Sequence, residues 1–347
     1  MGEDDGFAAR VGTHLRRRWR LTRLIGVGGL AGVYEAEHTV GRRAAIKLLR
    51  PEVAAEPDIR ARLEREARTS NAVGHSGLVE VLDVDETDDG TPFLVMELLQ
   101  GQTLAEVGAR DPLPVDRLLT YVDETLDVLV ACHDQGVVHR DIKPGNLFVT
   151  TEGHIKVLDL GGARVREGMT TLTEGHLATV AFMAPEQAAG GDVDARADLF
   201  GLGATMFKLL AGRHVHLAPD EATLATMVLT RPAPPFTSVA PAPHDDPPLG
   251  WVVDRALAFL AAHRYPDART MRGDVWALQR KRRPPYAFAC HESGPSPHAT
   301  SPDQPHPPST AAAGELPATD PQLPVFPAST PGEEATPNEA TPDEAAP

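Results

Sequence analysis

Cysteine is nearly absent from this chain of 347 residues, which contains only Cys132 and Cys290. Two thiols so far apart in the sequence cannot form the set of bridges that stabilises small secreted proteins. Residues 1–12 are acidic and lack the apolar stretch of a secretory signal peptide. A reducing, cytoplasmic setting is therefore the simplest interpretation.

Long apolar runs and a positive net charge are also missing. No apolar stretch reaches the roughly 18 residues that a membrane-spanning helix needs, so the sequence predicts no membrane span. The chain has 33 Lys and Arg against 49 Asp and Glu, a formal net charge of −16. This charge argues against nucleic acid as a partner, because phosphate contacts need clustered Lys and Arg. Hydrophobic residues still make up 41% of the chain, enough for a large core.

Basic residues end at Arg283. From Pro284 onward there is no Lys or Arg, and half of the 32 prolines lie there, among Ser, Thr, Ala and Glu. Such a composition cannot bury enough apolar surface to offset its conformational entropy, so a disordered acidic tail is predicted over 284–347. A flexible spacer is the simpler interpretation of this tail. The alternative is a segment that is phosphorylated or docks a partner.

The pattern of the remaining sequence changes from strand-like to helical near residue 100. Strands are predicted over 19–26, 32–38, 43–49, 78–85 and 92–99, with a helix inserted over 58–73. Apolar stripes then predict helices ending at Gly136 and Gly212, where a left-handed residue is favourable. Two more helices are predicted over 249–263 and 267–283. The sequence thus predicts an α+β protein with a small β-rich lobe and a larger helical lobe.

A glycine-rich segment, from Ile25 to Val33, joins the first two predicted strands. Glycines there allow backbone N–H groups to approach phosphate oxygens that any Cβ would block. Taken alone the segment is a weak signal, since glycine-rich hairpins are common. Lys47 follows in an apolar strand, where a lysine needs a partner, and Glu66 on the next helix could supply one. A surface lysine is the alternative.

Two further segments place charged residues at spacings that suit phosphoryl transfer. In the segment from His139 to Asn146, Asp141 could accept a hydroxyl proton, Lys143 could lie beside the phosphoryl group and Asn146 could hold a metal. Asp159 follows the next apolar strand. One carboxylate to position the nucleophile and a second to bind Mg²⁺ is the arrangement that this chemistry requires.

These motifs, followed by Ala184-Pro-Glu186, resemble the eukaryotic-like serine/threonine protein kinases of bacteria. The resemblance covers roughly residues 19–280 and implies the two-lobed protein kinase fold. It implies an arm at 1–18, a catalytic domain at 19–283 that divides into lobes 19–99 and 100–283, and the tail at 284–347. It further implies transfer of phosphate from ATP, with Mg²⁺, to Ser and Thr of protein substrates.

The resemblance also implies roles for individual residues. Asp141 would be the catalytic base with Lys143 beside it, and Lys47, held by Glu66, would bind phosphates. Mg²⁺ would be held by Asn146 and Asp159. The nucleotide site would be completed by Ile25, Gly26, Val27, Gly28, Gly29, Val33, Met96, Glu97 and Leu99, with adenine bound by backbone groups of the last two.

The same resemblance implies contacts that stabilise the active site and residues that regulate it. Glu186 is expected to pair with Arg264, and Asp198 to accept backbone hydrogen bonds from the catalytic loop. The candidates for phosphorylation, opposite Arg140, are Thr170, Thr171 and Thr173, whereas Thr179 is assigned to the structure of the substrate site. Autophosphorylation of this loop would pass through a transient homodimer.

Ala31 stands where the resemblance leads us to expect a third glycine. If that position needs a positive φ, alanine costs roughly 1–2 kcal/mol. An alternative function is therefore a nucleotide-binding pseudokinase that acts as a scaffold through the tail. A small-molecule phosphotransferase is a third candidate, but the Ala-Pro-Glu motif and the loop threonines argue against it, because they serve protein substrates.

Overall fold

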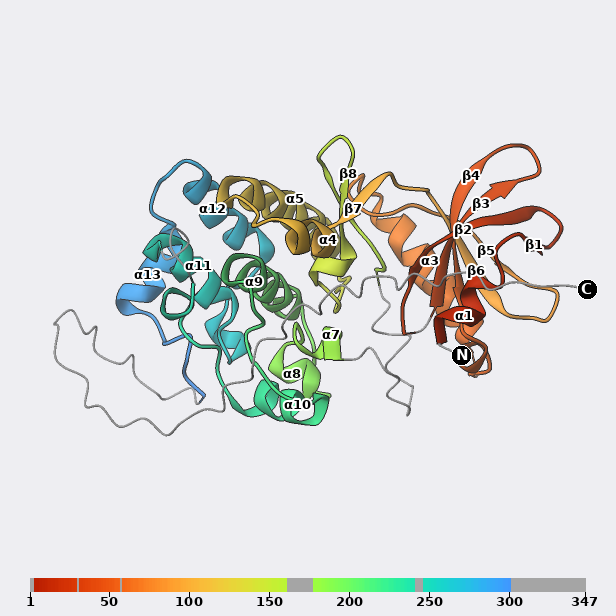
Figure 1. Ribbon diagram of the computed structural model, residues 1–347. Helices are drawn as coiled ribbons and strands as arrows, with labels where there is room; N and C mark the ends of the chain where they lie inside the picture. Colours follow the sequence, from red (N-terminus) through yellow and green to blue (C-terminus); the bar gives the residue numbers. More distant parts are fainter. Residues whose placement is uncertain (1–2, 30, 57, 161–176, 241–245, 301–347) are drawn as a thin grey trace, which may run out of the picture. The chain divides into compact units, whose positions relative to one another are not determined.

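The structure is a computed structural model that describes residues 3–29, 31–56, 58–160, 177–240 and 246–300 (Figure 1). Gly161 and the phosphorylation candidates Thr170, Thr171 and Thr173 lie outside the described residues, as does the stretch 301–347. Among the helices within the described ranges, none has the length and apolar character of a bilayer span.

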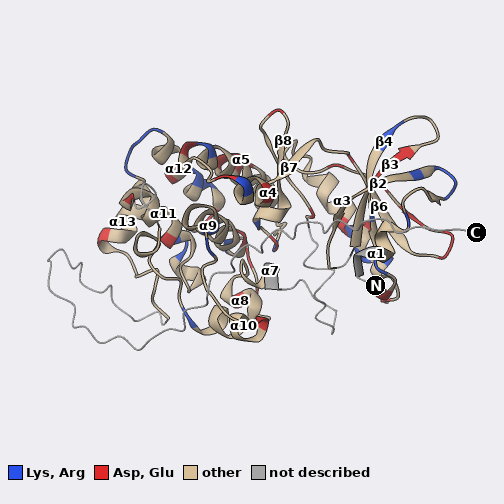
Figure 2. Cartoon of the chain, viewed as in Figure 1, with Lys and Arg blue, Asp and Glu red and all other residues tan. Residues whose placement is uncertain are grey.

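The first lobe is built on an antiparallel six-stranded sheet with the order β1-β2-β3-β4-β6-β5. Its strands are β1 (His14–Leu15), β2 (Trp19–Val27), β3 (Ala31–His38), β4 (Arg43–Leu49), β5 (Val81–Glu86) and β6 (Pro92–Met96). Both basic and acidic positions colour the ribbon of this sheet (Figure 2). Arg20 on β2 pairs with Glu37 on β3 at 2.9 Å. The five predicted strands are confirmed, although β5 begins later and β6 ends earlier than predicted.

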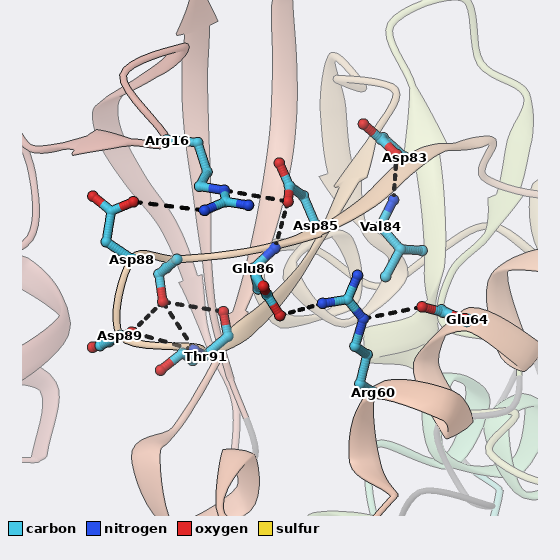
Figure 3. Close-up of polar contacts among 11 residues, drawn as sticks. Arg16, Arg60, Glu64, Asp83, Val84, Asp85, Glu86, Asp88, Asp89 and Thr91 are labelled. Atoms are coloured by element: carbon cyan, nitrogen blue, oxygen red, sulfur yellow. Dashed lines mark hydrogen bonds and ion pairs between the residues drawn. The ribbon is translucent and has the colours of Figure 1, made fainter.

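Helix α3 (Ile59–Val73) follows the short helix α2 (Pro51–Ala54) and packs on the sheet, as the four-residue apolar spacing predicted. At its start, Arg60 lies between Glu64 and Glu86 and bonds both carboxylates (Figure 3). These pairs are partly exposed, so they add little stability. They do connect the helix that carries Glu66 to strand β5.

The segment predicted as an N-terminal arm packs on the sheet. It forms helix α1 (Glu3–Ala8) and strand β1, which pairs with β2. Phe7 and Leu15 are buried in one apolar cluster with Leu21 and Tyr34. The Tyr34 hydroxyl donates a hydrogen bond of 2.9 Å to the Phe7 carbonyl. The first lobe therefore begins before residue 19.

The second lobe is helical and is organised around α5 (Val115–Asp134) and α9 (Arg196–Ala211) (Figure 1). Helix α12 (Ala268–Gln279) packs along α5, and α11 (Pro247–Ala256) packs against α9. Both predicted terminating glycines are confirmed, since Gly136 and Gly212 each have a φ of 70°. The predicted helix over 249–263 is too long: α11 ends at Ala256, and a separate 3-10 turn spans Ala261–His263.

A small sheet carries the segments that hold the motif carboxylates. Its order is β7 (Gly101–Thr103), β8 (Leu147–Thr150) and β9 (Ile155–Val157), and helix α4 (Leu104–Arg110) follows β7. Strand β8 begins directly after Asn146, and β9 ends two residues before Asp159. Pairing of β8 with β9 therefore brings the two predicted chemical segments together.

The prediction of disorder from Pro284 onward is wrong for its first residues. Residues Pro285–Ser293 form helix α13, and the backbone N–H groups of Tyr286 and Ala287 donate to the buried Asp274 carboxylate at 2.9 and 2.7 Å. Ala287 is 1% exposed. The apolar residues of this stretch are packed against the helical lobe. The average composition of 284–347 gave no sign of this, because the rest of the tail is rich in proline and polar residues.

Candidate active site

The predicted catalytic loop is held in place by Asp198, which is buried on α9. The Asp198 carboxylate accepts the backbone N–H groups of His139 and Arg140 at 2.9 and 2.6 Å, which confirms the expected role. His133 Nε2 lies 2.8 Å from the same carboxylate. Arg140 has a φ of 67°, a conformation that non-glycine residues adopt at some energetic cost. The bonds to Asp198 hold this backbone in place.

Asp141 lies at the centre of a hydrogen-bonded group. Its Oδ2 accepts from Lys143 Nζ and from Asn146 Nδ2, each at 3.0 Å. Lys143 Nζ also donates to Thr179 Oγ1 at 2.8 Å. The structure thus brings three of the predicted residues together, and Lys143 connects the loop to the segment that precedes Glu186.

Lys47 on β4 and Asp159 after β9 form an ion pair, with 2.6 Å between Nζ and Oδ1. Burial opposes ionisation of Asp159, but the charge and hydrogen bond of Lys47 outweigh it and hold the pKa of Asp159 below its ordinary value. Asp159 is therefore ionised at neutral pH. The pairing of Lys47 with Glu66 stays a prediction.

The side chains of Asn146 and Asp159 offer oxygen ligands of the kind that Mg²⁺ prefers. Asn146 Nδ2 donates to both the carbonyl and the carboxylate of Asp141, which turns its Oδ1 away. No described residue donates to this Oδ1. The described residues also contain no group of three or more His, Cys, Asp or Glu suited to a metal. A Mg²⁺ ion here would therefore take its other ligands from phosphate and water.

The predicted adenine pocket is apolar. Val33 and Leu99 pack against the cluster that contains Met96, while Ile25 and Val27 are each 38% exposed on β2. The Glu97 N–H donates to the Glu80 carbonyl at 3.0 Å. Neither the Glu97 carbonyl nor the Leu99 N–H has a hydrogen-bond partner among the described residues. These two backbone groups are available to a ligand.

The glycine-rich segment closes on itself through a hydrogen bond of 2.8 Å from the Gly28 N–H to the Ala31 carbonyl. Ala31 is the first residue of strand β3 and pairs with Leu49, in an extended backbone that alanine can adopt. The glycine that the fold needs is Gly32, where a Cβ would lie 2.5 Å from the Phe7 ring. The departure at Ala31 is therefore compatible with the strand.

One connection behind the predicted adenine site had no signal in the sequence. Lys156 Nζ lies 2.5 Å from Glu97 Oε1 and 3.3 Å from the Leu78 carbonyl, and the Glu80 N–H donates to the same Glu97 oxygen at 2.9 Å. The two charged residues are 59 positions apart, and neither belongs to a motif. This contact fixes the backbone at Glu97.

The predicted pair of Glu186 and Arg264 is confirmed. The two side chains form a two-pronged contact with distances of 2.6 and 2.7 Å. Arg264 is fully buried and also donates from Nε to the Ala258 carbonyl at 2.8 Å. The contact anchors the end of the segment that contains Thr179 to the helical lobe.

The sequence is similar to known protein kinases. Residues 19–246 match the family model described as the protein kinase domain. A Corynebacterium glutamicum protein named "Probable serine/threonine-protein kinase PknB" is 37% identical over 276 residues, which is 76% of this chain and 42% of that protein. Serine/threonine-protein kinase PknA of Mycobacterium tuberculosis is 33% identical over 317 residues, 89% of this chain and 69% of its own.

Solved structures show the same fold. The crystal structure of the Mycobacterium tuberculosis PknI kinase domain superposes with a TM-score of 0.59 at 26% identity. The match covers 78% of this chain and 98% of that domain. The resemblance therefore includes both lobes of the compared domain, whereas the chain spans less than half of the corynebacterial relative.

Proposed function

Because the chain belongs to the protein kinase family, we propose that it is a serine/threonine kinase that transfers the γ-phosphoryl group of ATP to Ser and Thr hydroxyls of proteins. The observation that supports this proposal best is that Lys143 Nζ donates hydrogen bonds to both Asp141 and Thr179. Lys143 thus connects a carboxylate that can accept a proton with the segment expected to bind a protein substrate.

The described residues divide the chemistry among them. Asp141 orients the substrate hydroxyl and accepts its proton, while Lys143 offsets negative charge beside it. Lys47 neutralises phosphate oxygens, and Asn146 with Asp159 would hold Mg²⁺, which supplies further positive charge to the phosphates. The Glu97 carbonyl and the Leu99 N–H would bind the adenine edge.

The pseudokinase alternative rested on Ala31. Since this alanine lies in strand β3, paired with Leu49, that support is lost. All five polar residues that the reaction needs are present: Lys47, Glu66, Asp141, Asn146 and Asp159. We therefore keep the active enzyme as the proposed function.

Regulation by autophosphorylation is part of the proposal. We assign it to Thr170, Thr171 and Thr173, through a transient homodimer in the cytoplasm. Arg140 would bind the phosphate, and its backbone is already fixed: its N–H donates to Asp198, and its carbonyl accepts from Gln187 Nε2 at 2.7 Å. A phosphate adds roughly −1.5 to −2 of charge, enough to order a loop against an arginine.

The test is transfer of labelled phosphate from ATP to a generic protein substrate. We expect wild-type protein with Mg²⁺ to label Ser and Thr, and a chelator to abolish the reaction. Asp141→Asn should lower the rate by about 10²–10⁴, the range for loss of a general base. The exposed Lys281→Met variant is the control and should keep the wild-type rate. Equal rates for Asp141→Asn and wild type would overturn the proposed role of Asp141.

A further inference from the structure

Phe182 connects the predicted catalytic group with a positively charged region behind it. Together with Asp141 and Thr179, Phe182 lines one small cavity. Its ring also meets the His214 ring edge-on, with 5.3 Å between centroids, and Lys208 Nζ lies 5.8 Å from the Phe182 centroid. Lys208, at the end of α9, and His214, in the following loop, therefore lie one side chain away from the catalytic carboxylate.

The contact between Lys208 and His214 determines the protonation state and the tautomer of His214. The distance from Lys208 Nζ to His214 Nε2 is 2.9 Å, which requires the imidazole nitrogen to accept a hydrogen bond from the ammonium group. His214 is then neutral and carries its proton on Nδ1, a buried atom without a hydrogen-bond partner. Burial lowers the pKa of both groups, and the charge of Lys208 lowers the pKa of His214 further.

The described residues near Lys208 and His214 add positive charge and offer them no carboxylate. Arg213 is partly buried, and its Nε has no hydrogen-bond partner. Next to it, His216 lies close to Arg231, at the end of helix α10 (Glu221–Thr230). Asp220, in the same loop, caps α10 by accepting the Thr223 N–H. Among the residues that the structure describes, none supplies a carboxylate to Lys208, Arg213 or His214.

A partly buried cation without a counter-charge is unfavourable unless an anion reaches it. Here the partly buried Lys208 ammonium group lies between His214 and the Phe182 ring, which belongs to the segment expected to bind protein substrates. A carboxylate offers two oxygens to such donors. A basic side chain would instead meet like charge.

We propose that Lys208, with His214 beside it, binds an acidic side chain of the protein substrate near the phosphorylated residue. This inference rests on the proposed kinase function and gives it a substrate class: Ser or Thr in an acidic sequence. Phe182 is the spacer that sets the distance between this acidic contact and Asp141.

The test uses peptides in which one Asp is moved along an otherwise uncharged sequence around a single Thr, with a matching Arg series. We expect wild type to prefer one Asp position by about tenfold in kcat/KM, the contribution of one charge-assisted hydrogen bond. Lys208→Met should remove this preference while keeping the rate on the uncharged peptide. Lys208→Glu should favour Arg at that same position, whereas the matched surface change Lys281→Glu should leave the preference unchanged.

A second measurement is independent of turnover. The inactive Asp141→Asn protein should bind the preferred Asp peptide more tightly than the Arg peptide, and Lys208→Glu in that background should reverse the order. If wild type phosphorylates the Asp, Arg and uncharged peptides equally, only the acidic preference is wrong. If wild type phosphorylates no protein or peptide, the proposed kinase function fails, and this inference fails with it.

Discussion

At the residue scale, two ion pairs of the helical lobe differ in burial and should differ in energy. Arg264 is fully buried where it meets Glu186, whereas Arg269 and Asp134 are 62% and 48% exposed. We expect Glu186→Ala to lower the free energy of unfolding by about 3–5 kcal/mol, because it leaves a buried charge unpaired. Asp134→Ala should lower it by less than about 1 kcal/mol.

Denaturant unfolding of both variants checks this difference. Because Glu186→Ala acts through stability, its loss of activity at high temperature would not show a catalytic role. Equal unfolding free energies for the two variants would contradict the contribution assigned to burial.

Asp254, on α11, should make stability depend on pH. Burial raises its pKa to about 7, although it accepts the Phe236 N–H at 2.8 Å. In the unfolded chain an aspartate ionises near 3.9, so between about pH 4 and pH 7 only the unfolded state gains the charge. The free energy of unfolding therefore falls as the pH rises through this range.

Asp254→Asn keeps an oxygen for the Phe236 N–H but cannot ionise. We expect the melting temperature of this variant, relative to wild type, to rise from about pH 4 to about pH 7 and then level off. Melting curves across this range test the sign. A difference that stays constant with pH would contradict the raised pKa.

At the scale of elements, the start of strand β7 depends on a glycine. Gly101 has a φ of 143°, and a Cβ there would lie 2.0 Å from the Val149 carbonyl oxygen on β8. Gly101→Ala should therefore separate β7 from β8 and destabilise the protein by several kcal/mol, on the order of the larger single-site effects. Circular dichroism during heating measures the change.

Gly273 is the matched control for this change. It lies inside α12, and no atom of a neighbouring element lies within 4 Å of the position that a Cβ would take. Gly273→Ala should raise stability by about 0.5–1 kcal/mol, since alanine favours a helix over glycine by this amount. A destabilising Gly273→Ala would contradict the open space beside α12.

The elements also show what local sequence could predict. The strands that flank Lys47 and the helix that carries Glu66 follow from apolar spacing, because each buries one face in the same lobe. Helix α13 could not be found this way, since its burial depends on the distant Asp274 carboxylate. The contact of Lys156 with Glu97 was missed for the same reason: both partners are polar, and only the fold brings them together.

At the scale of the whole molecule, the folded unit extends beyond the matched residues 19–246 at both ends. Phe7 is buried beside Tyr34, and the Pro295 carbonyl accepts from buried Arg255 at 3.1 Å. We expect deletion of residues 1–18, or of everything after 283, to lower the melting temperature by several degrees. Each deletion uncovers apolar surface and leaves polar groups unpaired.

Truncation after residue 300 is the control for the second deletion. It keeps α13 and the Pro295 contact, and we expect it to melt within about one degree of the full chain, because a change that leaves these contacts in place should have little effect on stability. If truncation after 283 were equally stable, helix α13 would not belong to the folded unit.

The most direct test of the account is mass spectrometry of the purified protein after incubation with Mg²⁺ and ATP, with Asp141→Asn in parallel. We predict phosphothreonine at Thr170, Thr171 or Thr173 in wild type alone, together with transfer to an added protein substrate. If wild type binds ATP but transfers phosphate neither to itself nor to the added protein, the chain is not the kinase proposed.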